Sequence, residues 1–334
     1  MTATQQKPVY SVYIVSGTTK YNVTNAVISQ DRSEPDGQIA QRVILQLANV
    51  KVDGSWLSSL LKARDRVFIY ANDGTQEKEV FRGFLWTRAR NDSINEEKIQ
   101  YTCYDNLIYF QESEDSLYFP SGKSTEDVMS AICDKWGIKL QYSYDSITHT
   151  KLPLRGYLSD IFTGDILDQV KKRTGKKYVI LSDQDTMVVR PVGSNSTIYH
   201  FEAGKNIAQT ASGWTMDGVI TKVIIVGKSD NDDREPIEAT VSGKTSEYGT
   251  LQRIQRRSEG TTLADAKIEA QKTVDEYGEP KWEYEITAPD VPWIRKGDKI
   301  YVNAGEINGY RIVTEVDRAI DQKHREMTLH LEDV

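Results

Sequence analysis

The sequence predicts an α+β fold dominated by strands, in which two antiparallel β-domains flank a small α+β domain. Three observations support this prediction. Runs of β-branched and aromatic residues at strand spacing occupy both ends of the chain, two helix patterns and a hairpin occupy the middle, and a strand pattern near the start recurs near the end. The predicted ranges are 1–112, 113–198 and 199–334.

The first range reads as strands around one short helix. The expected strands alternate apolar and polar residues, and turn residues separate them. A charged loop is expected from Asp31 to Gly37, and a short helix from Trp56 with Trp56 on its packed face. The expected strands are 9–15, 20–28, 41–50, 67–70, 79–90 and 98–104.

The middle range carries helix signals. Ser124 is an N-cap with Asp127 at capping-box distance, and Gly137 ends this helix. A second helix is expected over 159–173, ended by Gly175, with an irregularity at Gly164. A hairpin over 178–191 completes the domain.

The last range returns to strands. VITKVIIV at 219–226 is a strong strand, and an acidic loop follows at 228–236. Residues 237–257 are expected to form a protruding hairpin. The apolar stripe of 262–277 predicts an amphipathic helix that ends at Gly278 and Pro280. Further strands are expected at 281–288, 299–303, 310–316 and 326–331.

The chain has 334 residues, of which 38% are hydrophobic and 27% charged, which is a globular rather than a disordered composition. Its net charge of −7 argues against a dedicated nucleic-acid binder, because phosphate binding needs clustered Lys and Arg. Cys103 and Cys133 are too few for a disulfide framework or a four-cysteine zinc site. Both are expected to be reduced. No signal peptide or membrane-spanning run is expected.

Three segments of the first range recur in order in the last. Residues 64–69 (RDRVFI) match 297–302 (GDKIYV), Gly83-Phe84 matches Gly309-Tyr310, and 98–105 match 326–333. One interpretation is two copies of one β-domain around an unrelated insert; the other is that any two antiparallel meanders look alike. A cyclic trimer of a duplicated domain would present six similar units, and could join a six-fold partner to a three-fold one.

The order of these segments resembles the baseplate hub proteins of contractile tails, in the late-control-protein-D-like and prophage tail hub group of Gram-positive phages and phage-tail-like bacteriocins. The motifs that carry the resemblance are FRGF at 81–84, YTCYD at 101–105, GDILDQV at 164–170, WIRKGDKI at 293–300 and GYRIV at 309–313. It covers nearly the whole chain. It implies that both β-domains are tail-tube-like antiparallel β-barrels.

The resemblance also implies a function. It implies a structural homotrimer, a pseudo-six-fold ring that joins the six-fold tail tube to the three-fold central spike. The implied partners are the tail tube protein, the central spike protein, and baseplate wedge or tape-measure proteins, with no sequence-specific nucleic acid and no membrane insertion. The chain would be made in the bacterial cytoplasm and assembled into the baseplate of a phage tail or tail-like particle.

No catalytic, cofactor or metal residues are predicted. SGKST at 121–125 resembles the end of a phosphate-binding loop, but residue 117 is Leu where that loop needs Gly. The acidic loop departs from an EF-hand, since Arg234 and Glu235 stand where Asp or Asn and Gly are needed. No two of the four histidines have metal-site spacing. The acidic residues and histidines considered are Asp230, Asp232, Asp233, His149, His200, His324 and His330.

Two basic groups are candidate docking sites for an acidic partner. The first lies at the end of the second predicted helix and the second on the expected hairpin; the alternative for both is solvated charge. The residues are Lys171, Lys172, Arg173, Lys176, Lys177, Arg253, Arg256 and Arg257. Two other functions stay open: a tail-associated cell-wall hydrolase, and a carbohydrate-binding protein favoured by the Tyr and Trp content.

Overall fold

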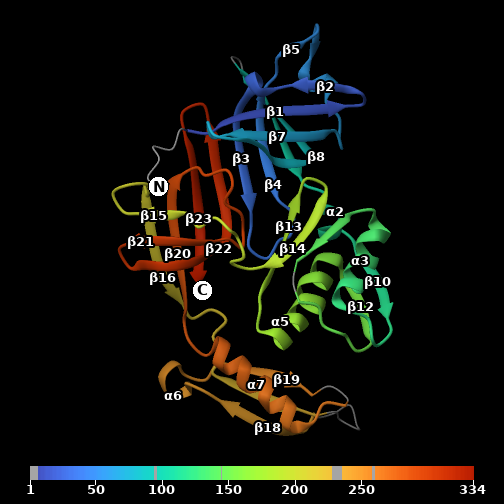
Figure 1. Ribbon diagram of the computed structural model, residues 1–334, viewed down its shortest axis with the longest axis vertical. Helices are drawn as coiled ribbons and strands as arrows, with labels where there is room; N and C mark the ends of the chain where they lie inside the picture. The colour runs from blue at the N-terminus through green and yellow to red at the C-terminus, as the bar shows by residue number, and fades with distance from the viewer. Residues whose placement is uncertain (1–6, 94–95, 144, 228–234, 258–259) are drawn as a thin grey trace. The chain divides into compact units, whose positions relative to one another are not determined.

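Alternating apolar residues build one large sheet from both ends of the chain. The computed structural model describes residues 7–93, 96–143, 145–227, 235–257 and 260–334 (Figure 1). By internal contacts it divides into two units, Met1–Ala211 with Glu285–Val334, and Ser212–Tyr284. The α+β, strand-dominated fold class is confirmed. The three predicted domain ranges stay predictions beside this division.

Within the described residues, thirteen strands form the large sheet, in the order β16-β20-β23-β22-β3-β4-β9-β8-β7-β1-β2, with β21 beside β22 and β15 beside β21. Those from the first part of the chain are β1 (Val9–Ser16), β2 (Thr19–Asn22), β3 (Val27–Glu34), β4 (Arg42–Ala48), β7 (Arg66–Asn72), β8 (Glu77–Ser93) and β9 (Glu96–Tyr104). Those from the last part are β15 (His200–Glu202), β16 (Gln209–Thr215), β20 (Lys281–Pro289), β21 (Lys299–Ala304), β22 (Ile307–Asp321) and β23 (Arg325–Asp333).

Strict alternation explains the first core. In β4 every second residue is buried, so Val43, Leu45 and Leu47 point into one cluster. A 3-10 turn, η1 (Thr24–Ala26), follows β2, and the short pair β5 (Lys51–Val52) and β6 (Ser55–Trp56) precedes α1 (Leu57–Leu60). Leu57 and Leu61 are buried, whereas the Trp56 residue is 45% exposed, so the prediction that Trp56 packs inward is wrong.

The predicted loop from Asp31 to Gly37 is also wrong at its start, because β3 continues to Glu34. Gln30, Arg32, Ser33 and Glu34 are buried between β4 and β22. These side chains are buried although they are polar, and among the described residues only some of their polar atoms have hydrogen-bond partners.

The duplication is visible as two meanders, β7-β8-β9 and β21-β22-β23. In the first, the backbone N–H of Leu85 donates to Asp65 O (2.9 Å) and that of Arg64 donates to Leu85 O (2.8 Å). In the second, the backbone N–H of Val313 donates to Asp298 O (2.8 Å) and that of Gly297 donates to Val313 O (2.7 Å). The match of 64–69 with 297–302 is therefore structurally correct.

The turn before each meander has the same side-chain lock. Asp65 Oδ2 accepts from the Lys62 backbone N–H at 2.7 Å, and Asp298 Oδ2 accepts from the Arg295 backbone N–H at 2.9 Å. Arg64 and Gly297 both have positive φ, 68° and 82°. The charged turn is thus the same local structure in both copies.

A bulge fixes the rest of the alignment. The β8–β9 register shifts between Leu85 and Thr87, and the β22–β23 register shifts between Val313 and Glu315. Leu85 pairs with Cys103 as Val313 pairs with Leu331, so residues 98–105 match 326–333 as predicted.

The predicted match of Gly83 with Gly309 is wrong by two residues, since the bulge places Gly83 opposite Arg311 in the alignment of the two copies. The glycines serve different purposes. A Cβ on Gly83 would lie 2.1 Å from Tyr104 O, whereas Gly309 has φ +112°. The turn between β7 and β8 is longer than the turn between β21 and β22, but the strand register next to the bulge is the same, since Arg66 pairs with Phe84 as Lys299 pairs with Ile312.

The middle of the chain packs around its own core. Its elements are α2 (Ile108–Gln111), β10 (Glu114–Phe119), α3 (Thr125–Trp136), β11 (Lys139–Tyr142), β12 (Leu152–Tyr157), α4 (Leu158–Asp160), the π-helix η2 (Ile161–Leu167), α5 (Asp168–Thr174), β13 (Tyr178–Asp183) and β14 (Thr186–Pro191). The Ser124–Asp127 capping box, the αL Gly137, the irregularity at Gly164 and the 178–191 hairpin are confirmed.

The unit Ser212–Tyr284 contains β17 (Lys222–Val226), β18 (Ile237–Ser242), α6 (Thr245–Tyr248), β19 (Gln252–Arg256) and α7 (Leu263–Tyr277). Ala266, Ala270 and Val274 of α7 pack against Val223 and Ile225, which confirms the amphipathic helix. The predicted hairpin over 237–257 is wrong. β18 and β19 lie on opposite sides of β17, one antiparallel and one parallel, because α6 carries the chain across.

None of the helices in the described residues is long and apolar enough to cross a membrane.

Candidate functional site

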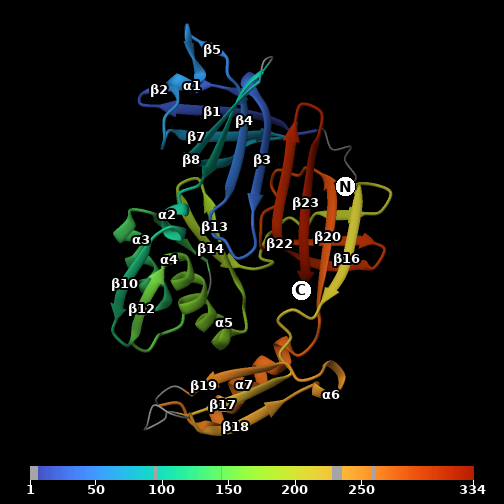
Figure 2. The same cartoon turned by 180° about the vertical axis from the view of Figure 1, so that it is seen from behind.

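The two copies of the β-domain join inside the chain where β3 pairs with β22. This antiparallel seam runs from Val316 opposite Glu34 to Asp321 opposite Ser29. Figures 1 and 2 show the two strands side by side from both faces. The seam makes one continuous sheet from the two copies.

A buried ion pair lies under this seam. Arg318 Nε donates to Asp290 Oδ1 at 3.0 Å, and both side chains are 0% exposed. The Tyr10 hydroxyl donates to the other carboxylate oxygen of Asp290. Burial raises the pKa of Tyr10 above its usual value, so the hydroxyl keeps its proton. Residues of β1, β22 and the segment after β20 therefore meet at one carboxylate.

Arg32 lies directly opposite Arg318 in the seam and is also buried. Its Nη2 donates to Pro292 O at 3.5 Å, and its guanidinium carbon lies 5.7 Å from the centre of the Tyr10 ring. Among the described residues, Nε and Nη1 of Arg32 have no hydrogen-bond partner. Burial, and then the charge of Arg318, lowers the pKa of Arg32 to about 10. The seam thus contains two cations and one close carboxylate.

A second buried carboxylate, Glu34, connects the seam to the turn before β21. It accepts from Arg295 Nε at 2.6 Å, from the Lys296 backbone N–H at 3.1 Å and from Gln41 Nε2 at 3.3 Å. Burial acts to raise the pKa of Glu34, but the charges of Arg295 and Arg318 and the Lys296 N–H outweigh it, and the pKa lies below its usual value. Glu34 is therefore a charged, fully partnered group.

The same network reaches the middle of the chain. Arg190 donates to Asp298 at 2.6 Å, and Arg295 Nη2 donates to Ser182 O at 3.2 Å. Asp105 accepts from the backbone N–H groups of Gln41 and Leu107, both at 2.9 Å, while its burial raises its pKa to about 7. Buried hydrogen bonds thus join both β-domains and the insert; sequence reasoning missed this because charged residues read as surface.

The structure separates the predicted docking residues into two groups, each with local partners. Lys172 pairs with Asp168 (2.9 Å), Lys176 with Asp145 (2.6 Å) and Lys177 with Glu332 (3.0 Å), and Arg173 donates to Thr148 O (2.7 Å). Arg256 pairs with Glu235 (2.6 Å) and Arg257 with Glu238 (2.5 Å), and Arg253 is an exposed residue of β19. Much of this positive charge is balanced locally, and a docking role stays a prediction.

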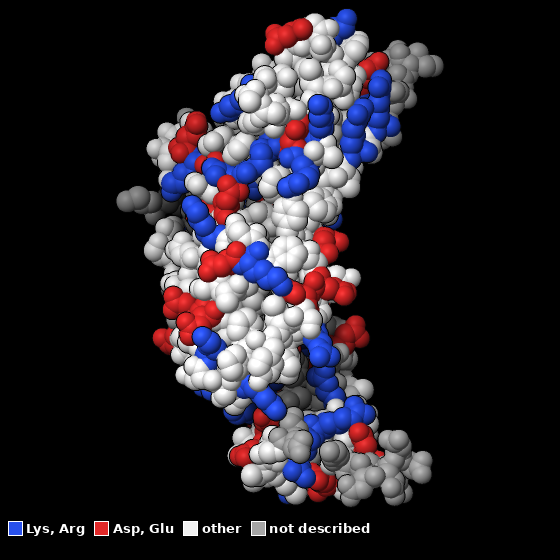
Figure 3. Space-filling view, turned by 90° about the vertical axis from the view of Figure 1, so that its right-hand side faces the viewer, with Lys and Arg blue, Asp and Glu red and all other residues white. Residues whose placement is uncertain are grey.

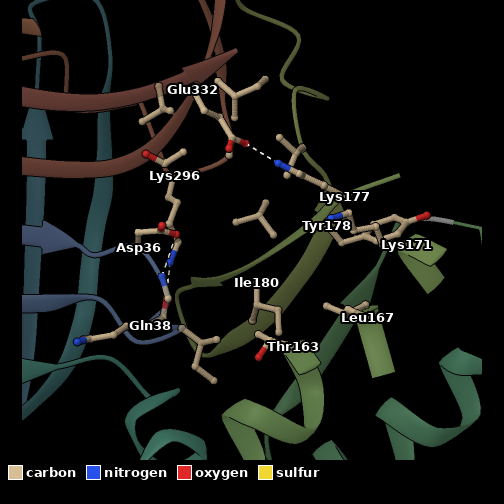
Figure 4. Close-up of a pocket in the computed structure, with 18 of the residues that line it drawn as sticks. Asp36, Gln38, Thr163, Leu167, Lys171, Lys177, Tyr178, Ile180, Lys296 and Glu332 are labelled. Atoms are coloured by element: carbon tan, nitrogen blue, oxygen red, sulfur yellow. Dashed lines mark hydrogen bonds and ion pairs between the residues drawn. The ribbon is translucent and has the colours of Figure 1, made fainter. Parts of the chain in front are cut away.

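Lys171 and Lys177 lie at one cleft of about 420 Å³ (Figure 4). Apolar side chains such as Leu167 and Ile180 line it together with Asp36 and Lys296. On the face in Figure 3, basic and acidic side chains are interspersed, as expected of a mixed rather than a single-sign surface.

Glu315, Asp317 and His330 offer ligand atoms within 4.8 Å of one another. His330 Nε2 lies 3.9 Å from Asp317 Oδ2, and its Nδ1 lies 3.8 Å from Glu285 Oε2. The side chains are partly exposed and come from paired strands. The sequence missed this cluster because the bulge after Val313 brings Glu315 opposite His330. Of the described residues, these three could hold a divalent cation.

The acidic loop residues Asp230, Asp232 and Asp233 lie outside the described residues.

Comparisons with known proteins agree with this architecture. Over 236 residues the chain is 23% identical to the phage-like element PBSX protein XkdQ of Bacillus subtilis, covering 69% of this chain and 70% of XkdQ. Its fold is similar to that of the 43 kDa tail protein of prophage MuSo2 from Shewanella oneidensis, with TM-score 0.72 and 11% identity over 96% of this chain and 98% of that one.

A tail protein from Neisseria meningitidis MC58 has TM-score 0.70 and 13% identity, over 97% of this chain and 96% of that one. The chain shares the fold of these two tail proteins, which confirms the resemblance noted from the motifs. Residues 65–332 match the YQBQ-like family over most of the chain, and the protein belongs to that family.

Proposed function

We propose that this chain is the structural hub of a contractile tail baseplate. Three copies would form a pseudo-six-fold ring that joins the six-fold tail tube to the three-fold central spike. The observation that carries this proposal is the duplicated β-domain, with the same charged turn and the same bulge in both copies. The similarity in fold to two tail proteins supports it.

The symmetry of a ring sets how many equivalent surfaces it offers to its partners. A closed ring of identical chains repeats each surface once per chain. Three chains with two similar β-domains each offer six similar surfaces to a tube and three identical surfaces to a spike. This matching of symmetries requires stable folding and defined contacts, and no catalytic step.

The partners follow from this role. We expect the tail tube protein and the central spike protein on the two faces of the ring, and baseplate wedge or tape-measure proteins beside it. The basic groups at the end of α5 and on β19 are the candidate contacts for acidic partners. The relatives and structures reported above carry tail or phage-element names and no hydrolase name.

Electron microscopy of the purified chain, alone and with its tail tube protein, tests the proposal. Closed rings of three chains with six similar lobes are the expected particles. Single chains or open filaments in both samples would contradict it.

A further inference from the structure

The long strand β22 is paired along both of its sides. β23 covers one side from Arg311 to Ile320. On the other side β21 covers residues up to Ile312, and β3 covers Val316 to Asp321. Beyond β21, this side of β22 is thus paired with β3, which in turn pairs with β4 in the other copy of the β-domain.

β8 is the counterpart of β22, and the common bulge sets the correspondence, with Leu85 at the place of Val313. β9 covers one side of β8 from Phe84 to Ser93, and β7 covers the other only up to Phe84. In the part of the chain that the structure describes, no strand pairs with this second side over residues 88–93. These residues correspond to 316–321, which β3 covers.

β16 is the counterpart of β3. In the first copy the sheet order is β3, β4, β9, and in the second it is β16, β20, β23. Since β23 is the counterpart of β9, β20 corresponds to β4 and β16 to β3. β16 lies at one end of the sheet order, and six of its seven residues are exposed. Its sequence, QTASGWT, contains no charged residue and no proline, the features that usually protect a sheet edge.

We propose that β16 of one copy pairs antiparallel with residues 88–93 of β8 in the next copy, as β3 pairs with β22 inside the chain. The occupant of both edges is a second copy of this chain. The two edges differ, so the contact is head-to-tail and generates a ring if it closes. The inference rests on the proposed ring and names the surfaces that build it.

Arg90 supports the correspondence. It stands at the place of Arg318, and it too faces a carboxylate, with Nη2 3.3 Å from Glu97 Oε2. The Arg318 side chain is 0% exposed under β3, whereas that of Arg90 is 41% exposed. Asn49 corresponds to Asp290 in the same way. The backbone N–H of Asn49 donates to Glu97 O, and the backbone N–H of Asp290 donates to Arg325 O. The seam between copies would bury Arg90 with Glu97 as the internal seam buries Arg318 with Asp290.

Disulfide cross-linking of the full chain tests the seam. Ala89→Cys is combined in turn with Thr210→Cys, Ala211→Cys and Ser212→Cys. Because side chains alternate between the two faces of a sheet, at least one of these three successive positions lies on the same face as Ala89. Both native cysteines are buried and do not compete. After mild oxidation we expect at least one double variant to give covalent trimers on a non-reducing gel. Each single variant stays uncross-linked, because identical positions do not meet in a head-to-tail contact.

A control pair of cysteines and the sedimenting mass distinguish a failure of the proposed seam from a failure of the proposed ring. Ala319→Cys, in the half of β22 that β3 already covers, replaces Ala89→Cys and should give no cross-link with any of the three β16 positions. If the double variants sediment at three chain masses yet none cross-links, the seam is wrong and the ring stands. If they sediment as single chains at every concentration and none cross-links, both proposals are wrong.

Discussion

The buried pair of Arg318 and Asp290 gives a sharp test of how the two β-domains are held together. Asp290→Asn keeps the shape of the side chain but removes its charge, and places an amide N–H₂ against the Arg318 or Tyr10 donor. Two arginines, Arg318 and Arg32, then stay buried without a nearby anion at Asp290. Removal of one partner from a buried ion pair costs about 3–5 kcal/mol.

At roughly 2 °C per kcal/mol for a long chain, this cost lowers the Tm by about 6–10 °C. Thermal unfolding followed by circular dichroism measures it. Asp145→Asn is the matched control, since the Asp145–Lys176 pair at 2.6 Å is largely exposed. Solvent screens an exposed pair, so this variant lowers the Tm by much less than Asp290→Asn does. Equal shifts for the two variants would show that the buried pair contributes no more to stability than the exposed one.

Three further predictions concern the same seam and its turns. Arg32→Met costs less stability than Arg318→Met and is neutral or stabilising. The reason is that Arg32 has two nitrogen atoms without partners among the described residues and lies opposite another cation. Chemical denaturation of both variants ranks their free energies of unfolding, and the reverse order would contradict this prediction. Asp105 has a pKa of about 7 in the folded chain against its ordinary 3.8, so the folded state binds the proton more tightly and Asp105 makes stability fall as pH rises from about 4 to about 7. Asp105→Asn should remove this contribution from the pH dependence of Tm, and an unchanged slope would contradict the raised pKa. Gly297→Ala destabilises the fold by about 1–3 kcal/mol, because φ is +82° and the new Cβ would lie 2.6 Å from Val179 Cγ1. Arg64→Gly at the equivalent turn stabilises it by up to about 1 kcal/mol, because glycine adopts the positive φ of +68° without strain. Denaturant midpoints decide this pair, and a loss of stability in Arg64→Gly would show that the two turns are not equivalent.

Local signals in the sequence predicted local structure well. The Ser124 capping box and the αL Gly137 depend on neighbouring residues alone, and both are confirmed. The charged turn at 64–69 and its copy at 297–302 were recognisable because one Asp performs the same backbone lock in each. The Gly-aromatic match failed because the two turns differ in length, so the same motif falls at different paired positions, with Gly83 opposite Val67 and Gly309 opposite Val302.

Long-range burial was the part that sequence reasoning could not reach. Arg32, Glu34 and Arg318 look like surface residues, and only the pairing of β3 with β22 buries them together. The expected hairpin over 237–257 failed for a related reason. β18 and β19 have strand composition, but their partner is β17, and composition does not say which strand lies between them.

The mass of the protein in solution shows whether three of these chains form one ring. Light scattering on a sizing column, over a range of concentrations up to the highest that stays soluble, gives that mass. We expect about 114 kDa, three times the 37.9 kDa chain. A mass of one chain at every concentration, with and without the tail tube protein, would contradict it.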